Sequence, residues 1–115
     1  MRVTTDLWVS ALMRRVFSGG GFAAVVRKGA AESGAVFVLA RDRLGTAQLF
    51  GPAPQSSYDT SSPQDRFFVR VGDGDDMAAL EARLEKEQKF DSDIWVLEIE
   101  MGGGKVEDLL PVTTL

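Results

Sequence analysis

The chain contains neither histidine nor cysteine among its 115 residues. Without histidine it lacks the side chain that most often transfers protons near neutral pH. Without cysteine it has no thiolate nucleophile and can form no disulfide. Zinc and iron–sulfur sites that need nitrogen or sulfur ligands are excluded for the same reason. Any chemistry therefore depends on carboxylates, guanidinium and ammonium groups, hydroxyls and backbone amides.

Long hydrophobic runs are also missing, and no apolar stretch approaches the roughly 20 residues that a membrane-spanning helix needs. The apolar stretch 7–13 follows Asp6 and ends at Arg14 and Arg15, so we expect a helix of the folded protein and not a signal peptide. The lack of cysteine is compatible with a reducing compartment. We therefore expect a soluble, cytoplasmic protein that does not contact a membrane.

The composition is typical of a globular protein, with 44% hydrophobic and 26% charged residues. The net charge of −4 is unevenly distributed, because residues 1–70 hold nine basic and five acidic residues, whereas residues 71–115 hold four and twelve. Such asymmetry indicates either two halves that neutralise each other or a surface for a partner. Because nucleic-acid-binding domains are usually basic, the acidic total favours mutual neutralisation over nucleic-acid binding.

Two stretches carry apolar residues at the three- and four-residue spacing of an amphipathic helix. They are residues 6–18 and 76–89. The glycines at 19–21 end the first helix, because glycine readily adopts the left-handed conformation found after a helix. The acidic residues that begin the second helix are favoured there by the helix dipole.

Five further stretches are rich in β-branched and aromatic residues and are predicted to be strands. They are Phe22–Arg27, Ala35–Ala40, Thr46–Phe50, Phe67–Val71 and Ile94–Met101. The element order is therefore α-β-β-β-β-α-β, and short turns favour antiparallel pairing, with the first two strands forming a hairpin. We expect an α+β fold: a mainly antiparallel five-stranded sheet with two helices packed on one face.

The sequence predicts one domain over residues 1–101, followed by a flexible or loosely packed tail over residues 102–115. Within the domain, the stretch Gly51–Asp65 is rich in proline and serine and contains the only tyrosine, Tyr58. A loop of this length is uncommon in a small domain and is either functional or a mobile connector. Tyr58 is the candidate anchor for a partner at this loop, because aromatic side chains dominate many interfaces.

Two glycine runs invite comparison with phosphate-binding loops, at 19–21 and at 102–104. The first follows a helix instead of preceding one, and the second lacks the spacing and the hydroxyl residue of a P-loop. Both are better interpreted as caps or hinges.

Acidic residues form two further candidate sites. The aspartates at positions 73, 75 and 76 do not match a calcium-binding loop and suit a helix start. Glu98 and Glu100 share one strand face and, with a third acid, suit a metal-dependent hydrolase. Their simpler interpretation is a solvated strand face that resists aggregation.

Arginines supply the remaining candidate binding residues, since the guanidinium group suits carboxylate and phosphate equally. The five that we place on one binding face are Arg14, Arg15, Arg27, Arg41 and Arg43. With Phe68 beside Arg66 and Arg70, such a face also suits phosphates and stacked bases. Pairing to the acidic C-terminal half is the competing interpretation.

Three short segments resemble a bacterial protein family. They are Trp8–Leu12, Leu49–Pro54 and Trp95–Glu100. The resemblance, over about residues 4–100, is to family 1491 of the domains of unknown function, from alphaproteobacteria. It implies a bacterial cytoplasmic protein and supplies no activity, cofactor or functional residue.

The leading hypothesis is a small protein-interaction module without catalytic activity, which binds a protein partner or a second copy of itself. No residue pattern indicates a cofactor or a set of metal ligands. One alternative is a nucleic-acid or nucleotide binder that uses the arginine face. Another is a metal-dependent hydrolase that uses carboxylates.

Overall fold

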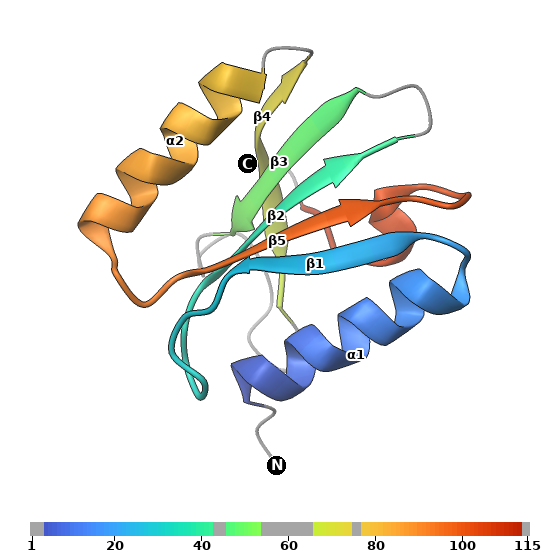
Figure 1. Cartoon of the computed structure of the whole chain (residues 1–115), viewed down its shortest axis with the longest axis horizontal. Helices are drawn as coiled ribbons and strands as arrows, with labels where there is room; N and C mark the ends of the chain where they lie inside the picture. Colours follow the sequence, from blue (N-terminus) through green and yellow to red (C-terminus); the bar gives the residue numbers. More distant parts are fainter. Residues whose placement is uncertain (1–3, 43–45, 54–65, 75–76, 114–115) are drawn as a thin grey trace.

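The computed structural model describes residues 4–42, 46–53, 66–74 and 77–113 of the chain. Two helices and five strands follow in the order that the sequence predicts, and a short 3₁₀ helix comes after them (Figure 1). They are α1 (Thr5–Ser18), β1 (Phe22–Arg27), β2 (Val36–Arg41), β3 (Ala47–Pro52), β4 (Phe68–Gly74), α2 (Met77–Phe90), β5 (Trp95–Glu100) and η2 (Val106–Asp108).

The five strands form one mixed sheet in the order β1-β5-β2-β3-β4. The strand pairs are antiparallel except β2 and β5, which run parallel. The prediction that β1 and β2 form a hairpin is wrong, because β5 lies between them. The physical reason lies in β5 itself: it is buried on both faces along most of its length, and a strand of that kind is stable only in the interior of a sheet.

The helices pack on opposite faces of the sheet, so the prediction of two helices on one face is also wrong. Val9, Leu12 and Val16 of α1 join the core on one side, and Leu80 and Leu84 of α2 join a second core on the other. Strand β2 explains the arrangement, since five consecutive buried residues on it require cover from both sides. The result is three layers, with α1 and α2 visible on either side of the strands (Figure 1).

The segment after β5 packs back onto the α1 side of the sheet. Val106 and Leu110 belong to the core there, and Leu110 is completely buried. Pro111 O accepts a hydrogen bond of 2.8 Å from the Phe68 amide, and the Thr113 amide donates one of 2.8 Å to Phe68 O. This segment therefore covers the start of the edge strand β4 and extends the hydrophobic core beyond residue 101.

The two glycine runs lie against each other. A Cβ atom on Gly102 would clash with the backbone of Gly20, and a Cβ atom on Gly21 would clash with Glu100 O. Glycine is therefore required here for close packing of two chain segments. The stretch Gly51–Asp65 begins inside β3, which continues to Pro52, and its residues 54–65 lie outside the described part. None of the described helices is long and apolar enough to cross a membrane.

Candidate functional site

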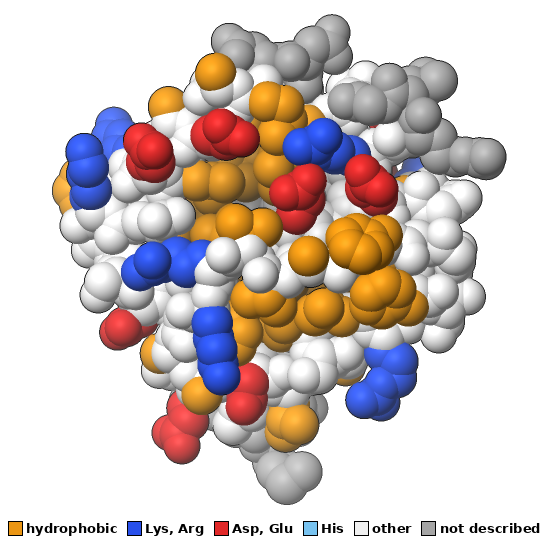
Figure 2. Space-filling view, viewed as in Figure 1, with side chains coloured by type: hydrophobic (Ala, Val, Ile, Leu, Met, Phe, Trp, Pro, Cys, Tyr) orange, Lys and Arg blue, Asp and Glu red, His pale blue; other side chains and the backbone are white. Residues whose placement is uncertain are grey.

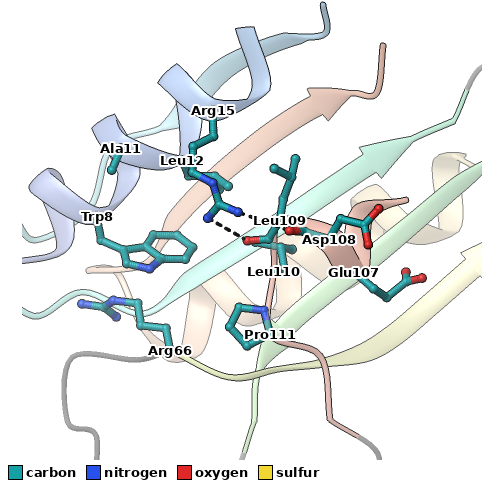
Figure 3. Close-up of a pocket in the computed structure, with 10 residues that line it drawn as sticks. All are labelled: Trp8, Ala11, Leu12, Arg15, Arg66, Glu107, Asp108, Leu109, Leu110 and Pro111. Atoms are coloured by element: carbon teal, nitrogen blue, oxygen red, sulfur yellow. Dashed lines mark hydrogen bonds between the residues drawn. The ribbon is translucent and has the colours of Figure 1, made fainter. Parts of the chain in front are cut away.

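A hollow with charged walls lies between α1 and the C-terminal segment, and we call it the α1 groove. It encloses about 370 Å³. Its lining comes from α1, from Arg66 just before β4 and from the segment after β5, which are far apart in sequence (Figure 3). The lining residues are Trp8, Ala11, Leu12, Arg15, Arg66, Glu107, Asp108, Leu109, Leu110 and Pro111.

Trp8 forms the aromatic wall of the α1 groove. Its ring stacks on the buried ring of Phe68, with centroids 5.5 Å apart, and the Arg66 guanidinium lies 5.7 Å from its centroid. These contacts fix the indole in place. Its Nε1–H donates no hydrogen bond to any described residue, whereas that of the second tryptophan, Trp95, donates to Ala30 O at 2.8 Å. This N–H is not among the buried polar atoms that lack a partner, so it is accessible from the groove and can donate to a ligand.

Two arginines flank Trp8, and each is held by the protein. Arg15 donates to Asp108 O at 3.2 Å and to Leu109 O at 3.4 Å, so it joins α1 to the C-terminal segment. Arg66 donates to the Thr5 hydroxyl at 2.6 Å, and that hydroxyl donates in turn to Gly34 O at 3.1 Å. Thr5 is completely buried, and this network positions Arg66 across the indole.

The acidic residues of the α1 groove lie at its opposite end. In Figure 3 the carboxylates of Glu107 and Asp108 are directed away from Trp8. An oxygen of Asp108 accepts a hydrogen bond from the Lys105 amide at 3.1 Å, which caps η2. The end beside Trp8 is therefore rich in donors and cationic, and the floor between the two ends is apolar, with Leu12, Leu110 and Pro111 among its residues.

The structure separates the arginines that the sequence places on one face. Neighbouring residues of a helix are about 100° apart around its axis. Arg15 consequently lines the α1 groove, whereas Arg14 is exposed outside it. Arg27 donates to Ser92 O at 2.8 Å, and Arg41 forms an ion pair of 3.2 Å with Glu98 at the other end of β5. Arg43 and Tyr58 lie outside the described residues.

The acidic candidates do not converge. Within the described residues, no three acidic side chains gather as a metal site would require. Glu98 is engaged by Arg41, and its strand neighbour Glu100 is exposed. Asp75 and Asp76 lie outside the described residues, and Asp73 is described only as part of β4.

Sequence reasoning missed Trp8, Thr5 and the C-terminal wall as parts of one site. Trp8 and Arg15 lie two turns apart on the same helix, but the position of Trp8 beside Arg66 depends on a contact across more than fifty residues. One available signal was the tryptophan at the border of the apolar stripe, since tryptophan is enriched where an apolar surface meets a binding partner. The burial of Leu110 had no comparable signal.

Comparisons with known proteins agree with this fold. The solution structure of protein Atu0922 from A. tumefaciens is 46% identical, with a TM-score of 0.82 over 97% of this chain and 95% of that one. A crystal structure of a DUF1491 family protein from Caulobacter crescentus is 41% identical, with a TM-score of 0.77 over 96% and 98% of the two chains. An NMR structure of a DUF1491 family protein from the same organism is also 41% identical, with a TM-score of 0.79 over 99% of each chain.

No match is found among curated proteins. The family model DUF1491, described as a protein of unknown function, matches residues 3–106. This match covers most of the chain and confirms the resemblance found in the sequence. The chain therefore belongs to the DUF1491 family.

Proposed function

We propose that the chain is a small protein-interaction module without catalytic activity, and that its α1 groove holds an extended segment of a partner protein. The observation that carries the proposal is the Trp8 Nε1–H, a donor without a described partner beside two fixed arginines and an apolar floor. Sites that bind peptides and other ligands combine apolar walls with a few fixed polar groups in this way.

The chemistry of the α1 groove defines the segment that fits. The Trp8 end offers N–H donors and positive charge, so it suits a carboxylate, which only accepts hydrogen bonds when ionised. The floor suits one or two aliphatic side chains next to that carboxylate. We therefore expect an acidic residue flanked by leucine, isoleucine or phenylalanine. A nucleobase fits less well, because the Trp8 ring already contacts both Phe68 and Arg66.

The two tryptophans make a direct test possible in the ¹⁵N–¹H spectrum of the full chain. The probe is a pool of capped hexapeptides in which Glu or Asp alternates with Leu, Ile or Phe. We expect the Trp8 indole signal to shift on addition of the pool. The Trp95 indole signal should stay in place, since that N–H is already bonded to Ala30 O. A Trp8 signal that does not move at millimolar peptide would refute the proposal.

The variant Trp8→Phe then tests the hydrogen bond. It keeps an aromatic ring against Phe68 but removes the indole N–H together with the rest of the five-membered ring. Loss of a hydrogen bond to a charged acceptor costs about 1.5 kcal/mol, so peptide affinity should fall about tenfold. The matched control is Arg14→Ala, which changes an exposed α1 residue outside the groove and should leave affinity unchanged. Equal affinity of wild type and Trp8→Phe would contradict the assignment of Trp8 as the donor.

A further inference from the structure

The face of the sheet that carries α2 is only half covered. α2 packs over Phe37, Leu39, Leu49 and Val96, which belong to β2, β3 and β5. The edge strand β1 receives no cover from α2, and Figure 2 shows apolar side chains gathered along β1 on this face. Side-chain alternation places Phe22 and Ala24 on this side of the strand, and Val26 follows them at an irregularity in the strand register.

Three large apolar side chains are exposed along this edge, and we call them the β1 strip. Phe17, Phe22 and Val26 are 48%, 56% and 61% exposed. Phe17, from the last turn of α1, meets the Phe22 ring edge-on with centroids 6.0 Å apart, so the strip is continuous from helix to strand. From Phe22 to Val26 the strip runs about 13 Å along β1. Contiguous exposed apolar surface of this kind marks an interaction site.

The charges that border the β1 strip indicate what covers it. Arg14 precedes Phe17 by three residues, so both lie on the same side of α1. On the opposite border, Glu100 is the cross-strand neighbour of Phe22. Both charged residues are exposed, and neither forms an ion pair with another described residue. Glu98, by contrast, is already paired to Arg41 at 3.2 Å.

We propose that the β1 strip is the contact between two copies of this chain, related by a two-fold axis. The strip has positive charge on one border and negative charge on the other. A two-fold rotation about an axis through the strip brings Arg14 of one copy opposite Glu100 of the second copy, and the same pair then forms a second time. The apolar residues of the two copies meet between these pairs. The surface is therefore complementary to itself.

The contact uses side chains of the sheet face and not the backbone of the edge strand. Strand β1 has a bulge between Val25 and Arg27, and bulges on edge strands interrupt the regular row of backbone groups that a further strand would need. A dimer formed through the β1 strip leaves the α1 groove open, since its lining comes from the other side of α1. The inference is thus independent of the proposed function, and each can fail without the other.

Sedimentation equilibrium of the full chain between about 10 µM and 1 mM tests the inference. We expect a particle of twice the 12.5 kDa chain mass to form within this range. Arg14→Glu and Glu100→Arg should each weaken the dimer about tenfold or more, because attraction becomes repulsion at both pairs. The double variant Arg14→Glu with Glu100→Arg restores opposite charges and should recover most of the affinity.

Two further variants address the apolar part of the contact. Phe22→Ser should shift the chain toward the monomer. Phe90→Ser is its control, since Phe90 is 80% exposed at the end of α2 and outside the β1 strip. Circular dichroism of each variant verifies that it is folded. A chain that stays monomeric at 1 mM would overturn the inference. So would a dimer that is insensitive to the charge exchange, because it would use another surface.

Discussion

Replacement of Leu110 by alanine tests whether the C-terminal segment is a structural wall of the α1 groove. Leu110 is completely buried between α1 and the sheet, although it follows a run of three glycines by only a few residues. Leucine-to-alanine changes at such sites cost about 2–5 kcal/mol, through lost burial and the cavity left behind. We expect a loss of about 3 kcal/mol in the free energy of unfolding. For a domain of this size, that lowers Tm by roughly 10 °C.

The measurement is urea and thermal unfolding followed by circular dichroism. The neighbouring Leu109 provides the matched control, since it is only partly buried against the same core. We expect Leu109→Ala to cost about 1 kcal/mol or less. A cost below about 1 kcal/mol for Leu110→Ala, or equal costs for the two variants, would refute the reasoning that this segment belongs to the core.

Two further predictions concern polar contacts. Thr5→Val should cost about 1–3 kcal/mol, because it removes the buried hydroxyl that bonds both Arg66 and Gly34 O. Thr4→Val, which affects an exposed hydrogen bond to Asp6, is its control in urea unfolding and should cost less. Glu98→Gln should change the unfolding free energy by less than about 1 kcal/mol, because its pair with Arg41 is about one-third exposed and is screened by salt. A cost above about 2 kcal/mol that persists in 1 M NaCl would contradict this assignment.

The local signals in the sequence were sufficient to predict the elements. Apolar residues at helical spacing predicted α1, and in the structure its Val9, Leu12 and Val16 are buried. The glycines after Ser18 marked its end. Periodicity succeeds in such segments because one buried stripe is enough to identify a helix. The same reasoning failed for strand pairing, because local turns do not reveal that β5 inserts between β1 and β2.

The candidate site was likewise predicted only in its local features. Arg15 was identified from the sequence as a binding candidate, and it lines the α1 groove. Its neighbour Arg14 was assigned to the same face, but the helical turn separates them. Trp8, Arg66 and Leu110 come together only through contacts between residues far apart in the chain. No spacing in the sequence encodes those contacts.

The sequence by itself determined the available chemistry and the succession of elements. Residue types determine the available chemistry, since a chain without histidine or cysteine can form no disulfide and no zinc or iron–sulfur site that needs nitrogen or sulfur ligands. Local periodicity determines the succession of helices and strands. Only the tertiary structure decided which face of the sheet each helix covers and how the C-terminal segment closes the α1 groove. It also decided that the α2 face stays uncovered along β1. Those outcomes depend on the burial of β2 and β5 from both sides, which is a property of the assembled sheet.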